Sequence, residues 1–501
     1  MTTKEAAVRF GALEKKLNAY DHAMGVIYYD SATAAPSGSA AERGETLGVL
    51  SGVYYELFAA PEVGELFETI LANKEEFDAL TVKKAEVMKR DYDEISKVPQ
   101  DEYIAFTKLC SDAESVWHRA KVENDFAAFA PYIDRIVETL VRFAGYYEPE
   151  KAPYDVWLSR YEKGLTQAEL DVFFGSLREK IVPLLRRIQS EAVQVDDSFL
   201  HQDYPIAQQK EFSDYLMDVL GIDKNYCAIG ETEHPFTTNF SKHDVRITTH
   251  YYAEHPEFSM YSVIHEGGHA LYELHTADEL IGSSLATGTT MGIHESQSRF
   301  FENMIGRSEP FVEYVFPKMQ ELFPEQLSGV TAHQMYLALN KCEPSLIRTE
   351  ADELTYSLHI MVRYEIEKKL FKGEVKAADL PALWQEMMHE YLGIDVPDNT
   401  SGVLQDSHWS NAQMGYFPSY AIGSAYAAQF AAHMKKTVDV EKAVSTGDLK
   451  PVRDWLCERI WRFGRAKDPA ELLEIACGEP FDPAYYTDYL TEKFSVIYGL
   501  N

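Results

Sequence analysis

The sequence predicts a mainly helical protein with a small antiparallel β-sheet. Helical periodicity fills the chain to about residue 225 and again from about residue 258 onward, and one short segment between them alternates with the period of a strand. The 501 residues contain no repeat period, no low-complexity tract and no Gly/Ser-rich linker. One large domain covering residues 1–501 is therefore favoured over several.

Residues 1–225 are predicted to be helices joined by short polar turns, at which prolines stand. These prolines are Pro61, Pro99, Pro153 and Pro183. The segment Thr166-Gln-Ala-Glu169 is a capping-box signature for the start of a helix. Because residues 1–200 contain no metal-type cluster and no glycine-rich phosphate loop, we interpret 1–225 as a helical wall or lid and 226–501 as the part with the functional site.

A small sheet is predicted between the two helical parts. From His243 to Tyr251, apolar and polar residues alternate, which is typical of a strand. Residues 233–240 could pair with this strand through a turn at Ser241-Lys242. Such a sheet would offer a backbone edge on which an extended peptide could lie as an added strand.

The central motif is His265-Glu266-Gly267-Gly268-His269, inside a mostly apolar run that predicts a buried helix. On a helix, residues i and i+4 share a face, so the two imidazoles can take two corners of a tetrahedral zinc site. Glu266 can reach a metal-bound water as general base. The alternative is a pair of helix histidines satisfied by hydrogen bonds, with Glu266 at the surface. The apolar flanks argue against that alternative.

A catalytic zinc site needs a third protein ligand, and three residues of the next predicted helix, 293–304, are candidates: His294, Glu295 and Glu302. Glu295 lies 26 residues after His269, a helix–loop–helix distance, and is favoured. The alternative for Glu295 is a carboxylate that supports another ligand or the start of the helix. The intervening residues 282–292 are small and polar and predict a loop. Further helices are predicted over 331–342, 344–371, 377–392 and 418–434, and two more begin at Asp468-Pro469 and Asp482-Pro483.

Composition restricts partners and compartment. The net charge of −33 repels nucleic acid and anionic membranes, so neither is an expected partner. Five widely spaced cysteines without a Cys-x-x-Cys pair suit a reducing compartment. The N-terminal residues lack a basic region followed by an apolar core, and no apolar run approaches the length of a membrane span. We expect a cytoplasmic protein.

Six blocks of sequence together resemble the carboxypeptidase Taq family of zinc carboxypeptidases. They occur in the family's order and span residues 234–409, and the likeness extends to Tyr29-Asp30-x-x-Thr33-x-x-Pro36 near the start. The blocks are His234-Pro-Phe236, Asp244-x-Arg246-x-Thr248, His265-Glu266-x-Gly268-His269, His294-Glu295-Ser-Gln-Ser298, Ile347-Arg348-x-x-Ala351-Asp352-Glu-Leu-Thr-Tyr356 and Gly402-x-x-Gln405-Asp406-x-His408-Trp409. Gly267 departs from the bulkier residues of some relatives, which leaves the ligands intact and affects only local helix rigidity.

The resemblance implies a helical fold cut by a deep groove, as in angiotensin-converting enzyme and neurolysin-type peptidases, with zinc on the groove floor. It also implies removal of C-terminal residues from peptides with a free C-terminal carboxylate, broad specificity, homodimers and a cytosolic setting. The expected metal is one Zn²⁺ per chain, held by His265, His269 and Glu295, with Co²⁺ or Mn²⁺ as substitutes.

The remaining candidates hold the substrate. Arginine forms bidentate pairs with carboxylates, and by motif position Arg246 and Arg348 are the candidates for the substrate's C-terminal carboxylate. Each could instead form a structural ion pair, with Asp244 or Asp352 as partner. The oxyanion of the tetrahedral intermediate needs donors as well. The candidates are His234, His408 and a tyrosine of the segment 416–420, with Tyr420 preferred to Tyr416.

The sequence therefore predicts a zinc metallocarboxypeptidase in which Glu266 activates a zinc-bound water and passes the proton to the departing amine. An oligoendopeptidase with the same metal site but no carboxylate clamp is one alternative. A catalytically silent, peptide-binding helical scaffold is the other. Glu266 disfavours the scaffold, because a purely structural metal needs four closed ligands and no base.

Overall fold

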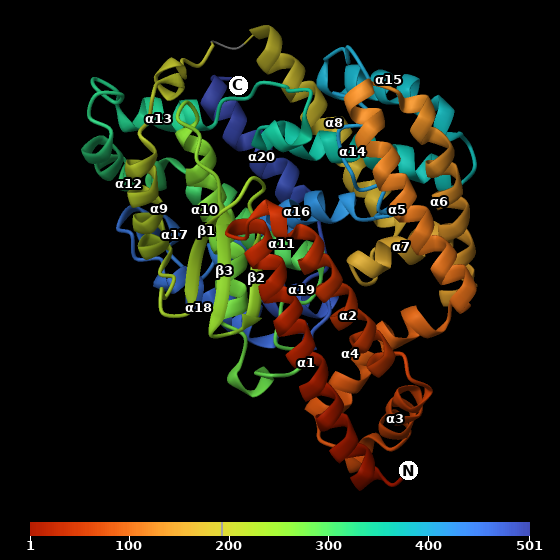
Figure 1. The fold of residues 1–501 in the computed structure, drawn as a ribbon. Helices are drawn as coiled ribbons and strands as arrows, with labels where there is room; N and C mark the ends of the chain where they lie inside the picture. Colours follow the sequence, from red (N-terminus) through yellow and green to blue (C-terminus); the bar gives the residue numbers. More distant parts are fainter. Residues whose placement is uncertain (192–193, 501) are drawn as a thin grey trace.

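A computed structural model describes residues 1–191 and 194–500, and it confirms a mainly helical fold with a small sheet (Figure 1). The helices before the sheet are α1 (Thr3–Thr33), α2 (Ala40–Phe58), α3 (Pro61–Ala72), α4 (Ala79–Ser96), α5 (Gln100–Glu123), α6 (Phe126–Tyr147), α7 (Pro153–Tyr161), α8 (Gln167–Glu191) and α9 (Ile206–Leu220). After the sheet come α10 (Pro256–Leu274), α11 (Met291–Arg299), α12 (Glu309–Leu322), α13 (Ala332–Leu339), α14 (Glu353–Phe371), α15 (Leu380–Leu392), α16 (Phe417–Met434), α17 (Val440–Ser445), α18 (Lys450–Arg459), α19 (Pro469–Cys477) and α20 (Ala484–Tyr498). None of the described helices is long and apolar enough to cross a membrane.

The sheet has three strands, β1 (Cys227–Glu231), β2 (Thr237–Ser241) and β3 (Asp244–Thr249), in the order β1-β3-β2. The predicted hairpin is confirmed, because β2 pairs antiparallel with β3. The sheet is mixed rather than purely antiparallel, since β1 lies parallel to β3 on the other side. The sequence did not predict β1 because its five residues, Cys-Ala-Ile-Gly-Glu, include a glycine and do not alternate between apolar and polar side chains.

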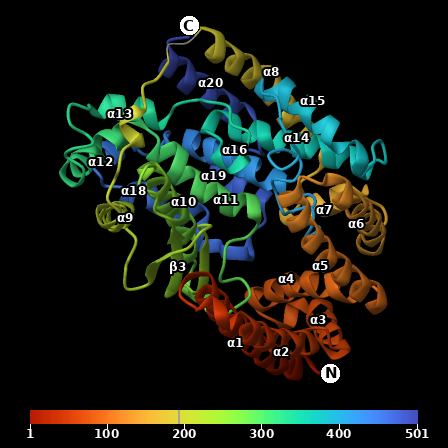
Figure 2. The ribbon, with the colours of Figure 1, turned by 45° about the horizontal axis from the view of Figure 1, so that its top comes forward.

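Two main hydrophobic cores lie on either side of a boundary near residue 97, and a small cluster of Val87, Leu280 and Leu285 lies apart from both. A small core is formed by α1 to α4, around Phe10, Phe58 and Phe67. A large, continuous core joins most of α5 to α20 and the sheet. In Figures 1 and 2, α1 to α4 lie together at one side of the molecule, and α10, α11 and α16 lie within the main body. The C-terminal part of α1 lies against the sheet region, where Tyr28 and Tyr29 pack against Phe236, the residue before β2. The functional division at residue 225 stays a prediction.

Local signals account for several helix boundaries. The Thr166–Glu169 capping box is present, with the two side chains bonding each other's backbone amides at 3.3 and 2.9 Å. The prediction that Pro183 stands at a turn between helices is wrong, because Pro183 lies inside α8. The helix predicted over residues 344–371 is shorter than expected, because α14 begins only at Glu353. Asp352 caps it by accepting the amides of Leu354 and Thr355 at 2.9 and 3.1 Å.

Candidate active site

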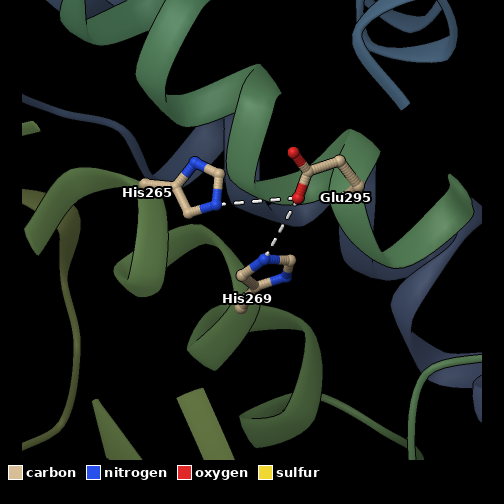
Figure 3. Close-up of side chains that lie close together, drawn as sticks. All are labelled: His265, His269 and Glu295. Atoms are coloured by element: carbon tan, nitrogen blue, oxygen red, sulfur yellow. Dashed lines mark ion pairs between the residues drawn. The ribbon is translucent and has the colours of Figure 1, made fainter. Parts of the chain in front are cut away.

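Two helices bring the three predicted metal ligands together. His265 and His269 lie one turn apart on α10, and Glu295 faces them from α11 (Figure 3). Glu295 Oε2 lies 3.6 Å from His265 Nε2 and 3.4 Å from His269 Nε2, and the three ligand atoms lie within 4.8 Å of one another. Donors about 2.1 Å from one tetrahedral ion lie about 3.4 Å apart. The three side chains therefore fit a zinc-sized cation.

Two glycines let these helices approach so closely. A Cβ on Gly268 would lie 2.5 Å from the carbonyl oxygen of Gln297 and 2.7 Å from Ser298 Cα, so only glycine lets α10 cross α11 there. A Cβ on Gly423, in α16, would lie 2.6 Å from Glu295 Cγ. Gly267 is different, since a Cβ there would meet the end of the flexible Leu220 side chain at 2.6 Å. α10 continues through Gly267 without interruption.

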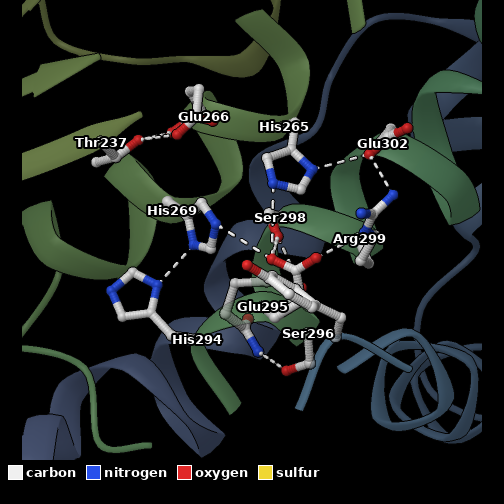
Figure 4. Close-up of polar contacts among 12 residues, drawn as sticks. Thr237, His265, Glu266, His269, His294, Glu295, Ser296, Ser298, Arg299 and Glu302 are labelled. Atoms are coloured by element: carbon white, nitrogen blue, oxygen red, sulfur yellow. Dashed lines mark hydrogen bonds and ion pairs between the residues drawn. The ribbon is translucent and has the colours of Figure 1, made fainter. Parts of the chain in front are cut away.

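The second ring nitrogen of each histidine ligand also has a partner: a carboxylate for His265 and a third imidazole for His269 (Figure 4). His265 Nδ1 lies 2.8 Å from Glu302 Oε2, and His269 Nδ1 lies 2.6 Å from His294 Nδ1. His294 Nε2 in turn lies 2.7 Å from Glu273 Oε1. If His294 donates to Glu273, its Nδ1 accepts from His269, which leaves His269 Nε2 unprotonated.

Of the three candidates for the third ligand, only Glu295 places an oxygen between the two Nε2 atoms. Glu302 is held beside His265 by a π-helical turn, Phe300–Gly306. Such turns are frequent at functional sites. His294 and Glu302 therefore contact the rings of the histidine ligands on the side away from Glu295.

Arg299 occupies Oε1 of Glu295, whereas Oε2 accepts from the Ser298 hydroxyl at 3.0 Å and faces the two histidines. Arg299 Nε donates to Glu295 Oε1 at 2.7 Å, and its Nη1 donates to Glu302 Oε2 at 3.1 Å. Burial would raise the pKa of Glu295, but Arg299 and His265 outweigh it and hold that pKa well below the ordinary range. Glu295 is therefore ionised, and Oε2 is the oxygen that points to the histidines.

Glu266 faces the sheet and is not a ligand. Thr237, at the start of β2, donates its hydroxyl to Glu266 Oε2 at 2.5 Å. The Glu266 side chain is buried, and burial raises its pKa while His265 lowers it. The sheet thus holds a carboxylate of raised proton affinity beside the ligands, as a general base requires.

Arg348 lies in a short turn before α14 and is buried with a second arginine around one carboxylate. Its Nη2 donates to Asp406 Oδ1 at 2.9 Å, and Arg363 Nε donates to Asp406 Oδ2 at 2.7 Å. Arg348 Nη1 also donates to the Tyr356 hydroxyl at 3.2 Å. The structural partner of Arg348 is thus Asp406 rather than Asp352, which caps α14.

Arg246 points from β3 toward α1. Its Nε and Nη2 pair with the two oxygens of Asp244 at 2.9 and 3.0 Å, as the ion-pair alternative expected. The guanidinium also lies over the rings of Tyr29 and Phe240, at 4.9 and 4.8 Å from their centroids. It borders a cavity of about 510 Å³ between α1 and α2.

Three of the oxyanion candidates lie together beside Arg348. His408 Nε2 lies 3.3 Å from the Tyr420 hydroxyl, and the Arg348 guanidinium lies 5.1 Å from the Tyr420 ring centre. The rings of Tyr416 and Tyr420 meet at 5.1 Å. The pKa of Tyr416 is raised, mainly by burial and also by the negative charge of Glu295. Burial lowers the pKa of His408 to about 4, so the ring is neutral at pH 7.

His234 is not part of this group. It is exposed in the turn before β2 and makes no hydrogen bond to a residue that the structure describes.

Sequence reasoning missed several supporting residues. They are Thr237, Glu273, Arg299, Arg363 and Asp406. Glu273 had a readable signal, because it lies four residues after His269 and so shares its helix face. Asp406 belongs to a quoted block, but nothing in one sequence indicates that Arg348 and Arg363 share it.

Comparisons with known proteins agree along the whole chain. The profile of the family described as carboxypeptidase Taq (M32) metallopeptidase matches residues 9–494. Carboxypeptidase 1 of Bacillus subtilis (strain 168) is 38% identical over 98% of this chain and 98% of its own. The crystal structure of the M32 carboxypeptidase from Deinococcus radiodurans R1 has a TM-score of 0.96 at 30% identity, covering 99% of this chain and 100% of that one. The structure of PZ peptidase A, at 13% identity and a TM-score of 0.57 over 100% of this chain and 98% of that one, shares the fold alone.

Proposed function

Because the chain belongs to the carboxypeptidase Taq (M32) family and is a metallocarboxypeptidase, we propose that it shortens peptides with a zinc ion held by His265, His269 and Glu295. The observation that carries this proposal is the convergence of Glu295 Oε2 with the two Nε2 atoms, at 3.6 and 3.4 Å, while both Nδ1 atoms are held elsewhere. Two imidazoles and one carboxylate suit Zn²⁺, and Co²⁺ or Mn²⁺ can replace it. Zinc bound there supplies a Lewis acid that polarises the peptide carbonyl and lowers the pKa of water.

Glu266 is the proposed general base. Its carboxylate takes a proton from the attacking water and returns it to the amine of the departing C-terminal residue. Thr237 keeps the carboxylate in one orientation by donating to Oε2, and burial raises its proton affinity. Both features suit a group that must accept a proton and release it in one turnover.

Arg348 is the proposed clamp for the C-terminal carboxylate of the substrate. Arg348 and Arg363 carry two positive charges and share Asp406, so this trio has one positive charge in excess. Arg363 is fully buried, whereas the Arg348 side chain retains 8% exposure. An arginine fork pairs best with a carboxylate, so the excess charge favours a peptide that ends in one.

Arg246 is the second candidate for binding the substrate. Its charge is matched by Asp244 alone, which leaves no excess there. We therefore assign the clamp to Arg348 and keep Arg246 as a substrate-binding residue beside the cavity.

Tyr416, Tyr420 and His408 are the proposed donors to the oxyanion. Both tyrosines pack against His408, and Tyr416 is favoured over Tyr420 because the charge of Glu295 affects the pKa of Tyr416. His408 is neutral near pH 7 and keeps one N–H to donate. The role of His234 stays a prediction, since its exposed turn touches none of these groups.

The metal content and the product pattern test this function. Purified protein should contain about one zinc per chain by elemental analysis, and it should release single residues from the C-terminus of a short free-acid peptide. Release of internal fragments would favour the oligoendopeptidase, and absence of hydrolysis would favour the silent scaffold.

We also propose a cytoplasmic homodimer. All five cysteines are free, which suits a reducing compartment. α2 buries only Phe58 among its 19 residues, so most of its surface is open to a second copy. Light scattering that reports a monomer at micromolar concentration would contradict the dimer.

A further inference from the structure

Glu162 is a buried carboxylate that the proposed reaction does not use. It follows the last residue of α7 and is 1% exposed. It thus belongs to the predicted wall, 130 residues before the helix that it touches.

The Glu162 carboxylate contacts the first turn of α11. Its Oε2 accepts the backbone N–H of Gly292 at 2.7 Å, and the Thr290 side chain and the Ile293 amide also interact with it. Amides in the first turn of a helix have no partner within the helix, and the positive end of the helix dipole favours an anion. α11 has no acidic residue in its own first turn. Glu162 supplies that charge from a distant part of the chain.

Helices α11 and α16 lie close together both at Glu162 and at the third ligand, Glu295. Tyr426, in α16, lies close enough to the Glu162 carboxylate to lower its pKa, which burial raises. One turn earlier in α16, the missing Cβ of Gly423 leaves room for the Cβ and Cγ of Glu295. Gly292 fits in the same way, since a Cβ there would lie 2.6 Å from Glu162 Oε2. Displacing the Glu162 carboxylate would therefore shift the turn from which Glu295 projects.

We propose that Glu162 is a positioning residue that fixes the first turn of α11 and thereby the third metal ligand, Glu295. It touches neither metal nor substrate, and its role rests on the proposed metal site. Burial raises the pKa of Glu162 to about 7, so the carboxylate is fully charged, and its contact with the amides of α11 strongest, above neutral pH. Supporting groups of this kind typically change metal affinity about 10- to 100-fold when they are removed.

The test compares two buried carboxylates after the same substitution. Glu162→Gln removes the charge next to α11. Glu367→Gln is the matched control, because Glu367 is also fully buried with a pKa raised to about 7, but it binds Tyr154, Trp409 and Gly415 instead of α11. Zinc affinity of the metal-free proteins is measured by competition with a chelator, and the visible spectrum of the Co²⁺-loaded proteins reports the ligand geometry.

We expect Glu162→Gln to weaken zinc binding at least about 10-fold and to alter the Co²⁺ spectrum, while Glu367→Gln keeps the wild-type values. Unchanged affinity and spectrum in Glu162→Gln, or equal losses in both variants, would overturn the proposal. If Glu162→Gln does not fold, Gly292→Ala decides, because its new Cβ displaces the carboxylate without removing it; the same loss of affinity supports the proposal and wild-type affinity overturns it. A wild-type protein that binds no zinc would instead refute the metal site itself.

Discussion

His269 Nδ1 and His294 Nδ1 lie 2.6 Å apart, and His294 Nε2 continues the contact to Glu273 at 2.7 Å. This chain of two imidazoles and a carboxylate fixes the ring of a metal ligand and raises its basicity. The sequence alone had offered His294 as a ligand. In the structure, His294 instead supports a ligand, because it holds the ring of His269.

We expect His294→Ala to weaken zinc binding about 10- to 100-fold without abolishing it, because His269 loses the partner that orients it. Chelator competition measures this, with Glu295→Ala, which removes a ligand, as the reference for a much larger loss. Equal losses in the two variants would show that His294 is itself a ligand.

Glu266→Gln should keep zinc and lose at least about 10²-fold in kcat, because the amide can still accept from Thr237 but cannot take a proton from water. Metal content and steady-state rates are compared in one preparation. Loss of zinc along with activity would mean that Glu266 holds the site's structure.

Tyr416→Phe should lower kcat more than Tyr420→Phe, since Tyr416 senses the charge of Glu295. Loss of one oxyanion donor typically costs about 10²- to 10³-fold in kcat. The two variants remove the same hydroxyl group, and both tyrosines are partly buried. The reverse order of effects would return the role to Tyr420.

Glu367 makes stability depend on pH. Burial raises its pKa to about 7 from an ordinary 4.5, so between these values the folded protein holds a proton that the unfolded chain releases. This contribution is complete below pH 4.5 and is lost as pH rises through 7, and it amounts to roughly 3 kcal/mol. In urea unfolding at pH 5 and pH 8, the loss of stability on raising the pH should be smaller in Glu367→Gln than in wild type. Identical pH dependence in the two proteins would contradict the raised pKa.

Patterns within short segments predicted much of the site. The i, i+4 spacing of His265 and His269 required only one continuous helix, and the alternation from His243 to Tyr251 required only one strand, so both could be read from the sequence. Glu295 could be favoured because it lies near the start of the next predicted helix, after a loop of suitable length.

Contacts between distant segments could not be predicted in the same way. Asp406 lies 58 residues from Arg348 and 43 from Arg363, and no local period connects them. The same holds for Thr237 and Glu266, and for Glu162 and Gly292. In each case the two partners lie on different elements, and only the packing of those elements brings them together. A single sequence does not reveal that packing.

Binding of the substrate's free C-terminal carboxylate by Arg348 distinguishes a carboxypeptidase from an endopeptidase with the same metal site. One short peptide is compared as free acid and as C-terminal amide, at the same metal content and pH, with products identified by mass. Losing the charge-assisted pair between a buried guanidinium and the carboxylate of the substrate costs roughly 2 to 5 kcal/mol, so the amide should be cleaved about 30- to several thousand-fold more slowly in kcat/KM. Arg348→Ala should reproduce much of that loss on the free acid. Equal rates for the two peptides, or cuts several residues inside the chain, would contradict the carboxylate clamp and leave the zinc site standing.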